Sequence, residues 1–307
     1  LEATTLGDWL KATSPQSRVV AVSGKDRAAI TMAGHKPDGV FWLFSGYGFT
    51  TYIPPGGDPA KALEPVAATN RRLAPRWTTK PTWTYHTTAC RAAATDTVQI
   101  AGKPFEPKLP PAGFGNSIPA SLLASPAGDE ITGEAARDLI KHYRLGQGPA
   151  TDLLAVSFSA TDWVGHRFGT RGPEMCEQMH RLDATIGRLF ADLDALKIPY
   201  LVVLSADHGG SDIPERLHTQ GYTAGRVSAS EVMGRVNKAL MAEFSLEKAP
   251  LIGSPDRRRP HPGRPARGRR RLYASRVALH ADSQGRATGR GEYERALRDE
   301  RPCNPFS

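Results

Sequence analysis

The chain has 307 residues, enough for one large α/β domain with a buried core. No stretch approaches the ~20 consecutive apolar residues of a transmembrane helix, so we expect no membrane partner. The net charge of +9 is unevenly placed. Residues 257–307 hold 14 Arg and 5 acidic residues, whereas the first 256 residues hold 26 basic and 26 acidic residues. The basic isoelectric point is therefore a property of the C-terminal segment, and the rest of the chain is neutral.

The N-terminal segment predicts a short helix over 4–12 and then a buried strand over 18–23. Lys25 and Arg27 follow that strand directly. A guanidinium binds phosphate as a fork and an ammonium acts as a compact charge, so the pair suits a phosphate group. The alternative is that this stretch is only a solvated turn.

The next segment begins with aromatic residues around a glycine turn, and 40–52 is typical of a β-hairpin. A helical stretch is expected over 60–74. Residues 77–128 are rich in Pro, Gly and Thr with little periodicity, which predicts an insertion lying over the strand ends and shaping substrate access. Trp77 and Trp83 could line that access or serve only as packing anchors.

The centre of the chain predicts a strand–helix–strand unit preceded by a helix over 129–143. Residues 153–158 and 200–204 are short apolar runs, typical of strands buried on both faces. Between them, apolar residues recur every three or four positions over 175–193, the pattern of an amphipathic helix. The two strands should be parallel.

Polar clusters follow both predicted strands. Asp162 and His166 come after the first, and Asp207 and His208 come after the second. Ligands of open parallel sheets bind beyond the carboxyl ends of the strands. Either pair alone could be a turn cap and an ordinary hydrogen bond, but two carboxylates and two imidazoles together favour zinc or a similar ion.

Three motifs resemble the alkaline phosphatase superfamily: T-D-W-V-G-H at 161–166, A-D-H-G-G at 206–210 and S-G-K-D-R-A-A at 23–29. The match is to the branch of type I phosphodiesterases and nucleotide pyrophosphatases, which includes single-chain bacterial alkaline phosphatases with a threonine nucleophile. It covers about residues 5–255. The resemblance implies an α/β fold, an alkaline-phosphatase-like α/β/α sandwich with a mostly parallel central sheet, here incomplete.

The resemblance also implies a function and residue roles. The family hydrolyses phosphomonoesters, with phosphodiesters as a further option, through a phospho-enzyme at a site with two Zn²⁺ ions. Asp162 and His166 would belong to the ion on the leaving-group side, and Asp207 and His208 to the ion on the nucleophile side. Lys25 and Arg27 would be catalytic, stabilising charge on the transferring phosphoryl oxygens. A small phosphate ester is the expected substrate, and a monomer in the periplasm or secreted is the expected state.

The sequence departs from the family at both ends. The family's nucleophilic Thr and first zinc-binding Asp precede the Lys-x-Arg element by a long stretch, but only 24 residues precede Lys25 and none matches. The family's last zinc-binding His belongs in the C-terminal region, where His261 and His280 lack its motif. Both zinc sites are therefore expected to be incomplete, with the Thr upstream of Leu1. We expect a fragment with weak or no activity.

The remaining features predict little chemistry. Cys90, Cys176 and Cys303 offer at most one disulfide, and Cys176 is expected to be a small buried hydrophobe in its helix. Residues 214–221 predict a surface loop on which His218 is solvated rather than a ligand. Residues 230–244 predict an amphipathic helix.

The domain organisation follows from this composition. We expect a partial alkaline-phosphatase-like domain over 1–256, with the insertion at about 75–128, and an Arg-rich tail over 257–307 that is disordered or non-native. The tail contains Arg but no Lys, together with Pro and Gly, and this composition is typical of an out-of-frame reading of a GC-rich gene. The alternative is that the tail is an arm that binds nucleic acid. Two other classes stay open: a sulfatase, phosphonate hydrolase or phosphoglycerate mutase relative, and a non-enzymatic protein that binds through its basic tail.

Overall fold

The computed structural model describes residues 2–93 and 96–251. The chain divides into two compact units, Leu1–Gly225 and Arg226–Ser307, and each is treated by itself. Among the described residues, no helix combines the length and the apolar character needed to cross a membrane. The expected tail over 257–307, including His261, His280 and Cys303, lies outside the described residues.

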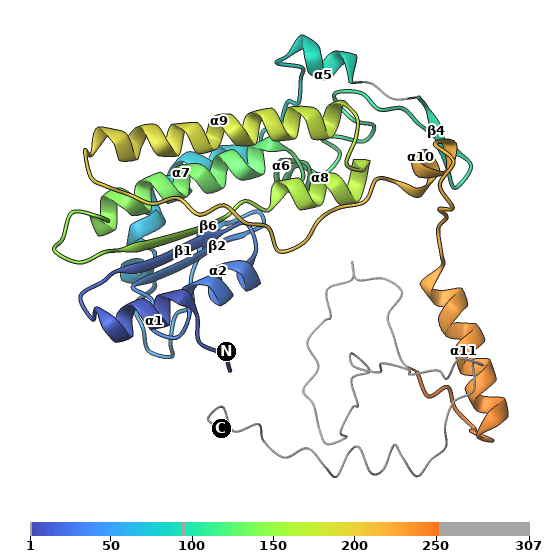
Figure 1. Cartoon of the computed structure of the whole chain (residues 1–307), viewed down its shortest axis with the longest axis horizontal. Helices are drawn as coiled ribbons and strands as arrows, with labels where there is room; N and C mark the ends of the chain where they lie inside the picture. Colours follow the sequence, from blue (N-terminus) through green and yellow to red (C-terminus); the bar gives the residue numbers. More distant parts are fainter. Residues whose placement is uncertain (1, 94–95, 252–307) are drawn as a thin grey trace. The chain divides into compact units, whose positions relative to one another are not determined.

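A four-stranded sheet forms the centre of the first unit (Figure 1). β1 (Val19–Ser23) pairs in parallel with β2 (Gly39–Phe44) on one side and with β6 (Leu153–Ser157) on the other. β3 (Gly48–Thr50) closes the expected hairpin antiparallel to β2. Every residue of β1 is buried, as a central apolar strand requires. The mostly parallel sheet is confirmed.

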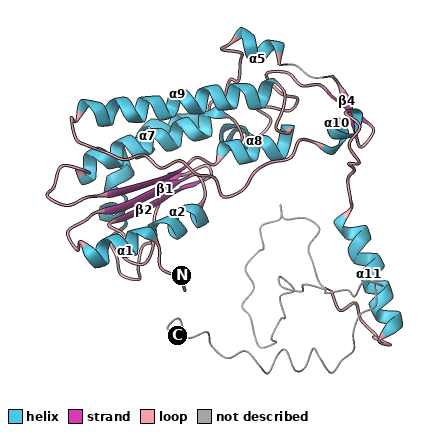
Figure 2. Ribbon diagram, viewed as in Figure 1, coloured by secondary structure: helices cyan, strands magenta, loops and turns pink. Residues whose placement is uncertain are grey.

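Helices cover both faces of this sheet (Figure 2). α1 (Leu6–Thr13) and α2 (Asp26–Ala33) lie on one face, and α7 (Pro126–Tyr143) and α9 (Pro173–Ala195) lie on the other. The apolar stripe of α7 packs with the sheet in the main core, whose largest members include Phe41, Phe49, Leu73, Ile131, Leu139 and Ile140. The expected α/β/α fold is thereby confirmed.

The helix expected over 60–74 is interrupted. It consists of α3 (Pro59–Leu63), a 3-10 turn (Glu64–Val66) and α4 (Ala67–Leu73). Pro65 explains the break, because its ring cannot be accommodated inside a continuous α-helix but fits the first turn of a new one.

The insertion is more ordered than its composition predicts. It contains short elements in sequence order: a 3-10 turn (Ala74–Trp77), α5 (Thr88–Ala92), the antiparallel hairpin of β4 (Val98–Ile100) and β5 (Lys103–Phe105), and α6 (Ile118–Leu123). Trp77 and Trp83 are buried. Trp77 belongs to the main core and Trp83 packs with Val164 and Phe168 in a second small core, so both tryptophans are packing anchors.

A disulfide fastens the insertion to the main body. Cys90 of α5 is bonded to Cys176 of α9, so the expectation that Cys176 is a simple buried hydrophobe was wrong. Beside it, the buried carboxylate of Glu177 accepts hydrogen bonds from the backbone N–H groups of His86 and Thr87, at 2.8 and 3.1 Å. A covalent bond and a buried carboxylate thus hold the same short stretch of the insertion.

The second strand of the predicted central unit is not formed. Residues 200–204 have no strand pairing, and the exposed fractions of Leu201, Val203 and Leu204 are 89%, 82% and 84%. An apolar run becomes a buried strand only if neighbouring strands and covering helices supply partners. In the described part of the chain β6 pairs with β1, and no strand lies along its other edge.

Three helices complete the described chain. α8 (Ala160–Phe168) begins three residues after β6, so Asp162 and His166 lie on this helix. α10 (Pro214–Thr219) replaces part of the loop expected over 214–221. α11 (Ala229–Glu243), in the second unit, confirms the helix expected over 230–244, although none of its residues is buried.

Candidate active site

The site begins where two parallel strands end side by side. Ser23 of β1 is in register with Ser157 of β6, so the segments after these strands start next to each other. The Oγ atoms of Ser23 and Ser159 lie 3.3 Å apart, and the backbone N–H of Lys25 donates to Ser23 Oγ at 3.0 Å. A Cβ on Gly24 would lie 3.1 Å from the Cβ of Ser159. Glycine therefore permits the close approach of the two segments.

Lys25 and Asp162 meet across this junction. The Nζ atom of Lys25 donates to Asp162 Oδ2 at 2.5 Å. The same ammonium lies 5.4 Å from the centroid of the Trp163 ring, a cation–π distance. The carboxylate and the ring come from neighbouring positions on α8, so one short stretch of helix holds the Lys25 side chain.

The predicted metal ligands gather around the other oxygen of the same carboxylate. Asp162 Oδ1 lies 3.3 Å from Nε2 of His166, one helical turn further along α8, and 3.6 Å from Nε2 of His208. The Oδ2 atom of Asp207 lies 3.6 Å from that same His208 nitrogen. The structure thus brings together Lys25, Asp162, His166, Asp207 and His208.

Two members of this cluster, Asp162 and His208, have shifted pKa values. Partial burial works to raise the pKa of Asp162, but the hydrogen bond and charge of Lys25, with the two histidines, outweigh it and hold the pKa below its ordinary value. The pKa of His208 is raised, first by the hydrogen bond of its ring to the Gly209 carbonyl and then by the charge of Asp207. Asp162 is therefore a carboxylate at neutral pH, the form in which it can bind a metal.

Arg27 is not drawn into this cluster. It lies in the first turn of α2 with a side chain 84% exposed, and its guanidinium is 3.9 Å from Asp26. Its assignment as a phosphate-binding group remains a prediction.

Comparison with known proteins identifies the family. Residues 4–275 match the family described as type I phosphodiesterase/nucleotide pyrophosphatase. The chain belongs to this family. The match continues past Pro255, where we expected the resemblance to end.

Several proteins similar to this chain are alkaline phosphatases. PhoD of Zymomonas mobilis is 37% identical over 247 residues, which are 80% of this chain and 42% of PhoD. PhoK of a Sphingomonas species is 37% identical over 258 residues, covering 82% of this chain and 43% of PhoK. The crystal structure of the alkaline phosphatase PafA superposes with a TM-score of 0.65 at 28% identity, covering 79% of this chain and 48% of PafA. The chain spans about half the length of the relatives it matches.

The donor set of this phosphodiesterase-family site fits a metal with nitrogen and oxygen ligands. A carboxylate oxygen lies between two imidazole nitrogens, and both histidines are accessible from solvent. Among the described residues, the one cluster with three potential ligand atoms within 4.8 Å of one another is Cys90, Cys176 and His180. Its two sulfurs are bonded to each other and are not thiolate ligands.

Several residues of the site were missed by sequence reasoning. Trp163 lies within the T-D-W-V-G-H motif, directly after Asp162, so its place in the sequence could have indicated that it belongs to the site with Lys25. Ser23 and Ser159 had only their positions at strand ends as a signal. Asp129 and Gln178, which hold the start of α8, lie on helices whose apolar periodicity gave no reason to single them out.

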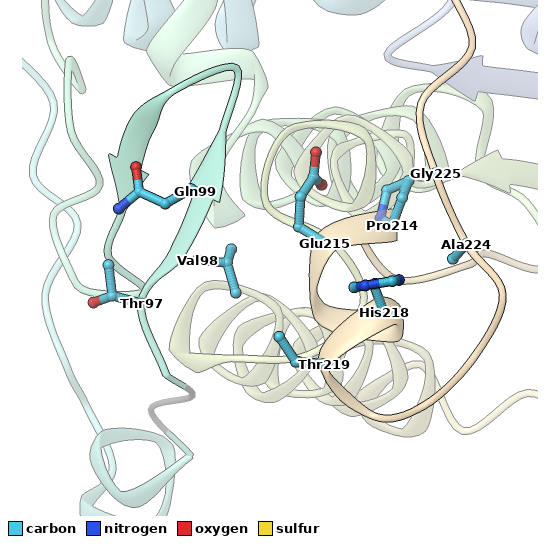
Figure 3. Close-up of a pocket in the computed structure, with 9 residues that line it drawn as sticks. All are labelled: Thr97, Val98, Gln99, Pro214, Glu215, His218, Thr219, Ala224 and Gly225. Atoms are coloured by element: carbon cyan, nitrogen blue, oxygen red, sulfur yellow. The ribbon is translucent and has the colours of Figure 1, made fainter.

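A separate cavity of about 470 Å³ lies between the β4–β5 hairpin and α10 (Figure 3). Val98 points from the hairpin toward α10, and Glu215, His218 and Thr219 line the other wall. His218 therefore belongs to this cavity and does not join the Asp162 cluster. None of the predicted metal ligands lines the cavity.

Proposed function

We propose that this chain carries part of the active site of a zinc-dependent phosphoric-ester hydrolase of the alkaline phosphatase type. The supporting observation is the cluster of Lys25, Asp162, His166 and His208 at the carboxyl ends of β1 and β6. Family membership gives the reaction class. Small phosphomonoesters are the proposed substrates, with phosphodiesters second.

The residues divide into metal-binding and phosphate-binding roles. Asp162 and His166 would hold one ion, and Asp207 and His208 the other. Zinc ions bound there would supply positive charge against the phosphoryl oxygens and the leaving oxygen. Lys25, whose ammonium is oriented by Asp162 and Trp163, would bring a further positive charge to the phosphoryl group. Arg27 extends into solvent, where a phosphate can approach its planar fork.

Turnover by this chain alone is proposed to be weak or absent. No match for the family's nucleophilic Thr precedes Lys25, and each proposed ion has two identified protein ligands where three or four are usual. Groups that act as a unit in catalysis lose most of their effect when one is missing. The chain also spans about half the length of its relatives.

A periplasmic or secreted location is part of the proposal. The bond between Cys90 and Cys176 supports it, because structural disulfides persist mainly in oxidising compartments.

The test measures zinc binding and hydrolysis of p-nitrophenyl phosphate at alkaline pH together. Asp162→Ala and Asp207→Ala should each lose the zinc ion that the replaced carboxylate would bind. Zinc binding should persist in Asp183→Ala, which removes an exposed carboxylate from α9. Equal zinc binding in the chain and in both ligand variants would refute the site. Zinc-dependent hydrolysis that disappears in Asp207→Ala would show that the chain is a competent enzyme and would refute the proposal of weak or absent turnover.

A further inference from the structure

The helix that carries Asp162 and His166 is not capped by its own sequence. The N-cap residue of α8 is Ser159, whose side chain makes no capping hydrogen bond and instead faces Ser23. The first N–H groups of a helix have no partner within the helix, so a buried start needs acceptors from elsewhere. Here the N–H of Ala160 donates to Oδ1 of Asp129 at 2.9 Å. A carboxylate of α7 thus caps α8.

A second helix joins this contact. Nε2 of Gln178, on α9, donates to the other oxygen of Asp129 at 2.7 Å and to Thr161 Oγ1 at 3.2 Å. The side chains of Asp129 and Gln178 are buried, with residue exposures of 1% and 0%. Side chains of α7 and α9 therefore form hydrogen bonds with Ala160 and Thr161, the two residues that directly precede Asp162.

We propose that Asp129 and Gln178 are positioning residues that fix the first turn of α8 and so aim Asp162 and His166 at the metal site. The proposal rests on the proposed function, in which both are metal ligands. It follows from the geometry of a helix, because the directions of side chains one turn apart are set together by the backbone that carries them. Removing a group that orients a metal ligand typically weakens metal binding about 10- to 100-fold.

The burial of these groups argues against a role in packing alone. Removing a carboxylate and an amide from water is costly, and Oε1 of Gln178 is buried with no hydrogen-bond partner among the described residues. Apolar side chains would fill the same space between α7 and α9 without that cost. The polar atoms converge on the start of α8, where they determine the backbone position next to Asp162.

The first measurement is zinc affinity by competition with a chromophoric chelator. Gln178→Leu removes both hydrogen bonds in a similar volume and should weaken zinc binding about 10- to 100-fold. Glu177→Gln is the matched control, since this equally buried neighbour on α9 contacts residues 86–87 and not α8. It should bind zinc within about twofold of the unmodified chain. The visible spectrum of bound Co²⁺, which reports coordination geometry, should change in Gln178→Leu and not in Glu177→Gln.

A pair of variants at Asp129 separates orientation from folding. Asp129→Asn keeps an oxygen to accept from the Ala160 N–H, and its amide can donate to Oε1 of Gln178 if that side chain turns over. It should retain zinc affinity. Asp129→Ala should weaken zinc binding by about the same factor as Gln178→Leu. Similar zinc affinities in both Asp129 variants would overturn the proposal.

Amide hydrogen exchange on the metal-free chain gives a readout that does not require zinc. Protection at Ala160 should fall about tenfold or more in Gln178→Leu and remain unchanged in the middle of α7. Unchanged protection overturns the inference, even if the unmodified chain binds no zinc and the proposed function has failed by itself. Reduced protection with unchanged zinc affinity also overturns it, because the network would then be only a structural cap.

Discussion

Lys25 and Asp162 are 137 positions apart in the chain, yet Nζ of one lies 2.5 Å from Oδ2 of the other. Their contact joins the segment after β1 to the first turn of α8. It also means that the ammonium and a metal ion would compete for the same carboxylate. Binding of zinc and binding of phosphate should therefore be coupled through Lys25.

Replacing Lys25 should have opposite effects on the two ligands. Lys25→Met removes a positive charge in contact with Asp162, so zinc should bind more tightly. The gain should be at most about tenfold at low salt, because water weakens the repulsion between an ammonium near the surface and a zinc ion. Inorganic phosphate should bind more weakly. Both effects can be measured by chelator competition and calorimetry at two salt concentrations. Lys11→Met is the control, since it breaks a similar ion pair with Asp38 at 2.7 Å elsewhere. Weaker zinc binding in Lys25→Met would contradict the competition.

Glu174 should make the metal-free chain less stable as the pH rises from about 4.5 to about 7. Burial raises the pKa of this carboxyl to about 7, although the Lys108 N–H and the Arg216 charge oppose the shift. Within that range the folded chain keeps the proton and the unfolded chain releases it, so the free energy of unfolding falls with pH. The loss from this group should reach on the order of 3 kcal/mol and be complete above pH 7.

Urea unfolding between pH 4.5 and 8 in the presence of a chelator tests this prediction. Glu174→Gln should flatten the fall in stability only partly, because burial also raises the pKa of Asp129 to about 7. Asp183→Asn, an exposed change, should leave the pH profile unaltered. A Glu174→Gln profile that matches the unmodified chain would show that Glu174 is not protonated in the folded state.

The sequence signals that predicted the candidate site are local. Asp162 and His208 each follow an apolar run, and the expectation that both runs are parallel strands predicted that these residues would lie close together. The first run is β6, whereas residues 200–204 have no strand pairing, although His208 still lies near Asp162. The contact of Lys25 with Asp162 agrees with this expectation, since β1 and β6 are neighbours in parallel. The central sheet and α7 followed from apolar runs and helical periodicity in the same way.

Other features of the structure depend on contacts between residues far apart in the chain, which local sequence patterns do not reveal. The number of cysteines permits a disulfide, but spacing alone does not pair Cys90 with Cys176 across 86 positions. Asp129 and Gln178 are polar residues on amphipathic helices, where such residues usually face solvent. Residues 200–204 have the composition of a buried strand, but their burial depends on a neighbour absent from the described sheet.

Reduction of the Cys90–Cys176 bond should destabilise the chain by about 2–4 kcal/mol, since the bond closes a long loop in the unfolded state. Cys90→Ser and Cys176→Ser should each show this loss, measured by urea unfolding with and without a reductant, and should no longer respond to the reductant. Thiol titration of the denatured chain checks the pairing. Of the three cysteines, one should react before reduction and all three afterwards. Three reactive thiols in the unreduced chain would contradict the disulfide.

The apolar run at 200–204 should make the chain associate through an exposed surface, against the monomer expected from the family resemblance. Leu201, Val203 and Leu204 are more than four-fifths exposed, and the run contains no charge, proline or glycine. Such a segment is a template for pairing between chains.

Leu201→Lys and Val203→Lys should lower concentration-dependent association, measured by light scattering after size-exclusion chromatography. They should change the free energy of unfolding by less than about 0.5 kcal/mol, because the replaced side chains are exposed and do not belong to the core. Asp183→Lys adds the same side chain at an exposed site on α9 and should not reduce association. If all three variants associate alike, the run is not the contact surface. If Leu201→Lys and Val203→Lys instead unfold the chain, the run is buried in solution.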